Sequence, residues 1–175
     1  MKSAFFAFVL VVLLSGCASR PPVVPAKAVD LPRYMGDWYV IANIPYWGEK
    51  NCYGSLERYR LLPDGLIDTR FIARKGGFYG RKYLVKSVAR VTDPVNNSQW
   101  EVLFLGGIFK VRLTILDVAP DYRYAVVVTP DRQLAWIFSR KPTLPARDYA
   151  AAVEVLKAND IKVERLEMVP QVPWT

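Results

Sequence analysis

The chain has 175 residues, with 24 Lys and Arg against 16 Asp and Glu, two cysteines and no histidine. The absence of histidine excludes Ser-His-Asp and Cys-His nucleophiles and every imidazole metal site. The length suits one domain, and 52% hydrophobic with 13% aromatic residues is typical of a packed globule. The formal charge of +8 would attract phosphate groups, so the cellular location decides whether nucleic acid is an available partner.

The N-terminal residues predict export. Lys2 precedes an apolar run at 4–14, which is too short to cross a bilayer, since a spanning helix needs about 20 residues. A Leu-Ser-Gly-Cys motif ending at Cys17 follows and resembles the bacterial lipobox. This resemblance implies a signal peptide at 1–16, acylation of Cys17 and a membrane anchor of two or three acyl chains.

Ala18 follows the lipobox cysteine in place of the Asp that usually retains such proteins at the inner membrane. We therefore expect an outer-membrane lipoprotein that faces the periplasm, where no nucleic acid is available. Residues 17–31 are rich in proline, which predicts an extended tether. The folded domain is expected at 32–175.

Short β-rich segments separated by turn residues follow the tether. They are enriched in Val, Ile, Tyr, Phe and Trp, and turn signals such as Pro63-Asp64-Gly65 lie between them. The expected strands are 38–44, 54–62, 67–74, 79–91, 98–104, 109–117, 122–129 and 134–140. Short joints favour an antiparallel meander, either a sandwich or a closed barrel, and closure would remove the exposed strand edges.

The character of the sequence changes after the eighth strand. Residues 146–159 are rich in Ala, Glu, Lys and Leu with apolar side chains at helical spacing, which predicts one amphipathic helix against the outside of the sheet. A final strand-like stretch at 162–169 is expected to pair with the barrel edge.

Two motifs resemble the signatures of the lipocalin family. Gly36-Asp37-Trp38-Tyr39 is similar to the first signature, Gly-x-Trp, and the segment 136–140 ends in Arg140, the Arg of the third. With the lipobox, the chain is similar to bacterial outer-membrane lipoprotein lipocalins. The resemblance implies an all-β fold, an eight-stranded antiparallel up-and-down β-barrel whose calyx binds a ligand, with one C-terminal α-helix packed outside. It also implies that Gly36, Trp38 and Arg140 are structural, with the guanidinium stacked on the indole at the closed end.

Strand alternation gives the expected calyx wall. If Trp38 points inward, so do the apolar residues two, four and six positions later, and Trp136 shares the inward face of the last strand. The loop after the first strand adds aromatic side chains at the open end. The expected ligand-binding residues are Val40, Ala42, Ile44, Tyr46, Trp47, Tyr53, Phe109, Lys110, Arg112 and Trp136.

The sequence of the sixth strand leaves two alternatives for the direction in which its cationic side chains point. Its apolar alternation buries Val111 and Leu113 and exposes Lys110 and Arg112. The resemblance instead turns Lys110 inward, where it could pair with a lipid head group.

The first functional hypothesis is a lipid-anchored carrier of a fatty acid or lysophospholipid for storage, transport or membrane maintenance, without a metal or organic cofactor. A second is an envelope protein-interaction module with a filled barrel, with a homodimer as an open possibility. A third is an enzyme that uses Cys52 or a carboxylate such as Glu57. The chain is not expected to be an enzyme, because without histidine only a neighbouring cation such as Lys50 would activate the thiol.

Overall fold

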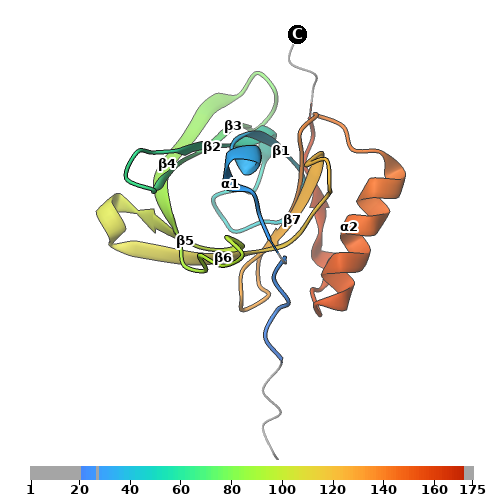
Figure 1. Ribbon diagram of the computed structural model, residues 1–175. Helices are drawn as coiled ribbons and strands as arrows, with labels where there is room; N and C mark the ends of the chain where they lie inside the picture. Colours follow the sequence, from blue (N-terminus) through green and yellow to red (C-terminus); the bar gives the residue numbers. More distant parts are fainter. Residues whose placement is uncertain (1–20, 27, 172–175) are drawn as a thin grey trace, which may run out of the picture.

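The computed structural model describes residues 21–26 and 28–171, in which eight strands form a closed antiparallel barrel (Figure 1). Each strand pairs with the next along the chain, and the eighth pairs with the first, which closes the barrel. The strands are β1 Gly36–Ile44, β2 Cys52–Leu61, β3 Ile67–Lys75, β4 Arg81–Val91, β5 Gln99–Phe104, β6 Phe109–Val118, β7 Tyr124–Val128 and β8 Ala135–Ser139. The predicted barrel class is therefore confirmed, and the sandwich alternative is excluded.

The hairpin turns follow the local chemistry of their residues. In the turn between β2 and β3, Gly65 adopts a φ of +82°, and the Asp64 side chain accepts a hydrogen bond from the Leu66 amide at 3.0 Å. The single-turn helix η1 (Leu105–Gly107) joins β5 to β6. Because consecutive strands alternate in direction, every second turn lies at the same end of the barrel.

One end of the barrel is closed by the short helix α1 (Leu31–Tyr34), which lies across the ring of strands in Figure 1. Tyr34 packs against Trp38 at 5.0 Å between ring centroids, and Tyr59 and Trp100 complete the group. All four side chains are buried. We call them the base cluster, because they fill the closed end with aromatic rings.

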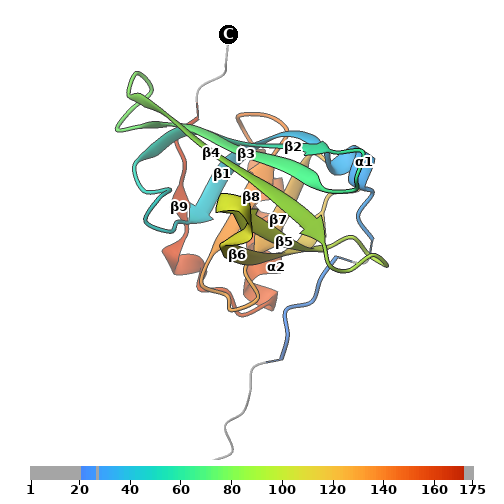
Figure 2. The same ribbon diagram turned by 90° about the vertical axis from the view of Figure 1, so that its left-hand side faces the viewer.

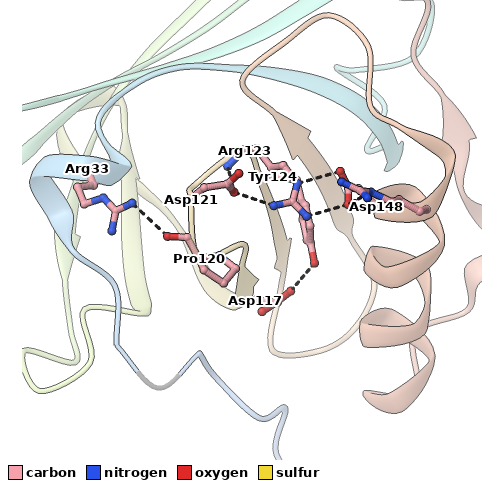
Figure 3. Close-up of polar contacts among 8 residues, drawn as sticks. Arg33, Asp117, Pro120, Asp121, Arg123, Tyr124 and Asp148 are labelled. Carbon is pink, nitrogen blue, oxygen red and sulfur yellow. Dashed lines mark hydrogen bonds and ion pairs between the residues drawn. The ribbon is translucent and has the colours of Figure 1, made fainter.

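Helix α2 (Ala146–Ala158) packs outside the barrel beside β7 (Figure 1). Ala152 and Leu156 are fully buried in an apolar layer shared with the outward-facing side chains of β7 and β8. Figure 3 shows a second attachment, in which the Arg123 guanidinium donates two hydrogen bonds of 2.9 Å to the Asp148 carboxylate at the start of α2. None of the helices in the described part of the chain is long and apolar enough to cross a membrane.

The proline-rich N-terminal segment packs on the barrel. Val23 and Val29 are buried, the amide of Ala26 donates to the Ile115 carbonyl at 2.8 Å, and that of Val29 donates to the Asn96 carbonyl at 2.7 Å. The prediction of a free tether reaching Leu31 is therefore wrong for the described part of this segment, because its valines find an apolar surface. The signal peptide and Cys17 lie outside the described residues.

The C-terminal segment completes the wall where β1 and β2 separate. The two strands pair only between Gly36–Tyr39 and Leu56–Tyr59. Beyond that point the short strand β9 (Glu167–Met168), preceded by the helical turn η2 (Val163–Arg165), pairs with β1. The strand expected over 162–169 is therefore mostly replaced by a turn, and the Gln171 amide bridges β1 and β2 by donating to the Val40 and Ser55 carbonyls.

Candidate functional site

At the closed end of the barrel, the Arg140 guanidinium stacks on the Trp38 indole. The Arg140 guanidinium carbon lies 3.7 Å from the Trp38 ring centroid, and its nitrogens donate to the Asp37 carbonyl at 2.8 Å and the Arg33 carbonyl at 2.6 Å. Trp38 is fully buried, and its indole N–H donates to the Tyr34 carbonyl at 2.8 Å. Gly36 has a φ of +94°, and a Cβ there would lie 3.4 Å from an Arg140 nitrogen, so this approach favours glycine. These contacts give the three residues a structural role at the base.

The interior towards the open end is apolar and less tightly covered. Four side chains there, Tyr83, Val85, Phe104 and Leu113, pack against the interior cluster yet remain only half-buried. Small side chains, such as Ala73 on β3, face the same space. We call the interior above the base cluster, bounded by these partly accessible apolar side chains, the cup; apolar walls of this kind suit an apolar guest.

A bulge in β1 changes which residues face this cup. Val40 pairs with Phe138, but Ala42 pairs with Ile137, so Ile41 is an extra residue in the ladder. An extra residue reverses the alternation beyond it. Val40 is in the interior cluster, whereas Ala42 and Ile44 lie in the apolar layer under α2. The prediction that Ala42 and Ile44 line the calyx is therefore wrong.

The cations of β6 face outward. Val111 pairs with Val102, which belongs to the interior cluster, so the flanking Lys110 and Arg112 are on the opposite face, and both are exposed. The residue pattern thus gives the correct orientation, and the inward Lys110 implied by the family resemblance is wrong.

Tyr53 also lies outside the calyx. It pairs with Arg74, one position away from the inward pair of Cys52 and Lys75, and its ring packs edge-on against Phe78 at 5.3 Å. Adjacent strand positions point to opposite faces, so the predicted calyx role of Tyr53 is wrong.

The other predicted aromatic residues are at the open end or inside. Tyr46 is half-buried in the loop after β1, and Trp47 beside it is 84% exposed. Phe109 is 61% exposed on the inward-facing side of β6, opposite Phe104. Trp136 is buried in the interior cluster.

Sequence reasoning missed a carboxylate that the loop after β1 inserts into the barrel. Glu49 is buried and accepts hydrogen bonds of 2.9 Å from the Asn43 amide and the Trp136 indole. Burial raises the pKa of Glu49 to about 7, although these hydrogen bonds act in the opposite direction. Glu49 therefore ties the loop to β1 and β8 and titrates near neutral pH.

A second carboxyl group, Glu57, faces the same interior. It pairs with Trp38 on one side and Phe71 on the other, both interior residues. Burial raises its pKa to about 8, with a further contribution from the charge of Glu49. The Glu57 side chain is consequently neutral at pH 7 and does not place a fixed negative charge in the cup.

The raised pKa of Glu57 predicts that stability falls as pH rises. The unfolded chain releases this proton near the ordinary glutamate pKa of about 4.3, whereas the folded protein holds it up to about pH 8. Between these values the unfolded state binds fewer protons, so the free energy of unfolding decreases with pH. Urea midpoints measured from pH 5 to pH 8 should decline, and Glu57→Gln should make the decline shallower. An equal decline in both proteins would contradict the assignment.

One cation and the free thiol complete the interior near the open end. The Lys75 ammonium lies 4.7 Å from the Tyr83 ring centroid and donates to the Gly48 and Lys50 carbonyls at 2.6 and 2.7 Å. Cys52 is buried, and burial raises the pKa of its thiol. The thiol is therefore protonated at neutral pH, which argues against a nucleophilic role.

Comparison with known proteins gives the same fold and adds the family. The model of the lipocalin-like domain family matches residues 29–171. The chain belongs to the lipocalin family. It is 27% identical to the outer membrane lipoprotein Blc of Vibrio cholerae over 96% of this chain and 98% of that protein. It is 28% identical to temperature-induced lipocalin-1 of Arabidopsis thaliana over 83% and 81% of the two chains.

A solved structure supports the lipocalin architecture. Insecticyanin from the tobacco hornworm Manduca sexta superposes with a TM-score of 0.67 at 21% identity, covering 87% of this chain and 86% of that one. As in lipocalins generally, the cup of the present barrel is a calyx for a small hydrophobic ligand.

Proposed function

We propose that this lipocalin is an outer-membrane-anchored carrier that faces the periplasm and holds a fatty acid or a lysophospholipid in its calyx, for storage, transport or membrane maintenance. The observation that best supports ligand binding is an apolar wall that remains half-buried above the base cluster. It consists of Tyr83, Val85, Phe104 and Leu113. An acyl chain would cover these side chains with its methylenes.

The free energy of burying methylenes is sufficient for such binding. Each buried CH₂ contributes about 0.8 kcal/mol, and micromolar affinity corresponds to about 8 kcal/mol, so burial of about ten methylenes suffices. The acyl chain would enter from the open end and stop above Trp38, because the base cluster fills the space below. Its polar head would then lie near Lys75, the inward-facing cation close to the rim.

The proposed location rests on the sequence and on the relatives. The lipobox ending at Cys17 supports removal of the signal peptide at 1–16 and acylation, and Ala18 supports the outer membrane. The relative from Vibrio cholerae carries the name outer membrane lipoprotein. A disulfide between two copies through Cys52 would require movement of the start of β2, because the thiol is buried.

Native mass spectrometry tests this proposal. The mature protein, extracted from membranes in mild detergent, should carry acyl chains on Cys17 and a separate, dissociable lipid mass. After delipidation, calorimetric titration with oleate and with lysophosphatidylcholine should give saturable binding of one molecule per protein. Absence of saturation with both lipids would favour the alternative, a filled barrel that docks another protein.

A further inference from the structure

The end of the barrel opposite α1 bears an unusual set of exposed apolar side chains. The loops 45–51, 76–80 and 105–108 and the turn 129–134 all lie at this end, because they join strands in alternate positions of the meander. Figure 2 shows α1 at one end and β9 towards the other. The first three loops and their edges carry Trp47, Tyr79, Leu105, Ile108 and Phe109, which are 61–103% exposed. We call these five residues the rim.

The described N-terminal segment begins at the same end, with Pro21. Arg132, in the turn between β7 and β8, donates a hydrogen bond of 2.5 Å to the Pro21 carbonyl and another of 2.7 Å to the Asn159 carbonyl. Only four residue steps separate Pro21 from the lipobox cysteine, Cys17. A fully extended chain of this length spans at most about 14 Å. An acylated Cys17 would therefore keep the bilayer close to the open end.

Basic side chains predominate on the three rim loops, although the exposed Glu164 and Glu167 line the surface next to Lys50. Lys50, Arg81, Lys82 and Lys110 are exposed on or next to the three rim loops. The sequence contains no acidic residue between Asp68 and Asp93, or between Glu101 and Asp117, the stretches that contain two of these loops. Basic residues near a membrane surface are attracted to anionic lipids, and Trp and Tyr side chains favour the interface between water and lipid.

We propose that the rim docks on the surface of the anchoring bilayer through anionic phospholipids, so that the mouth of the calyx opens onto the membrane. This inference rests on the proposed acylation of Cys17. The short anchor and the rim, with its flanking cations, would both contact the bilayer. Together they would fix the orientation of the barrel relative to the membrane. A ligand would pass between bilayer and calyx without crossing water.

Single cysteine variants of the mature lipoprotein test this orientation. Ile108→Cys is placed on the rim and Val95→Cys on the turn between β4 and β5 at the closed end; the two native side chains are 76% and 83% exposed. Each variant is labelled with an environment-sensitive fluorophore and reconstituted into vesicles of phosphatidylcholine with or without phosphatidylglycerol. Cys52 is buried and serves as the unlabelled background in the parent protein.

We expect the emission of the Ile108→Cys label to rise several-fold and shift to the blue in vesicles containing phosphatidylglycerol, and to be quenched by nitroxide lipids. The Val95→Cys label should not respond. No response at either position, or the same response at both, would overturn the docking proposal. A response that follows protein density rather than lipid charge would place a second copy on the rim and would also overturn it.

Two separate measurements distinguish failure of docking from failure of the proposed function. The intact mass of the same preparation reports acylation of Cys17, and calorimetric titration with oleate reports the calyx. If the acyl chains and oleate binding are present while the emission of the Ile108→Cys label does not change, only the docking proposal is wrong. Loss of oleate binding with a responding label would contradict the carrier function and leave docking intact.

Discussion

Replacing Val85 with tryptophan should weaken oleate binding at least about tenfold, which corresponds to about 1.4 kcal/mol. Val85 pairs with Phe71 and packs, half-buried, against the interior cluster. An indole at this position would occupy the space that the acyl chain needs. Excluding two methylenes at about 0.8 kcal/mol each already accounts for the tenfold loss.

The neighbouring residue provides a matched control. Leu84 lies on the same strand but on the outer face, paired with Ile72, and is 51% exposed. Leu84→Trp adds the same side chain outside the calyx and should leave the oleate affinity unchanged in calorimetric titration. Equal losses in the two variants, or no loss in either, would show that the acyl chain does not lie against Val85.

Trp38→Ala should lower the free energy of unfolding by about 3–5 kcal/mol, the range for truncating a large buried aromatic side chain. Trp38 is fully buried, donates a hydrogen bond to the Tyr34 carbonyl and supports the Arg140 guanidinium. Its removal leaves a cavity in the base cluster and an unstacked cation. Since domains are commonly stable by only about 5–15 kcal/mol, this is a large fraction of the total.

Trp47→Ala is the control for this change, because it removes the same side chain from a position that is 84% exposed. Its effect on stability should stay within about 0.5 kcal/mol, as for most surface substitutions. Urea denaturation followed by circular dichroism measures both variants. Similar losses of stability would contradict the assignment of Trp38 as the centre of the base.

The architecture was accessible from the sequence because its signals are local. Turn residues such as Gly65 separate segments of β-branched and aromatic residues, and the spacing of the meander leaves few ways to close the sheet. The helical pattern at 146–159 likewise corresponds to α2 within one residue. These features depend on neighbours in the chain.

The orientation of individual side chains was harder to predict, because it depends on single-residue irregularities. The bulge at Ile41 has no sequence signal, and it sends Ala42 and Ile44 under α2 instead of into the calyx. On β6, which has no irregularity between Phe109 and Thr114, simple alternation placed Lys110 and Arg112 correctly on the outside. Alternation is thus reliable only where the ladder is regular.

The interior positions of the two carboxyl groups were not predicted, for a related reason: Glu57 was named only as a candidate catalytic carboxylate, and Glu49 was missed. Strand β2 mixes polar and apolar residues, and its register shift between Tyr53 and Leu56 hides the inward position of Glu57. Glu49 is in a loop, where no periodicity indicates that its side chain turns into the barrel. The packing of Val29 on the barrel was hidden by the surrounding prolines, which suggested an extended tether.

The central claim is that an acyl chain occupies the barrel interior above Trp38. Nuclear magnetic resonance with methyl-labelled protein and oleate tests it most directly through intermolecular Overhauser effects. We predict contacts from the oleate methylenes to the Val85 and Leu113 methyl groups and none to those of Leu84. Contacts confined to outward-facing methyl groups, or none under saturating oleate, would contradict the account.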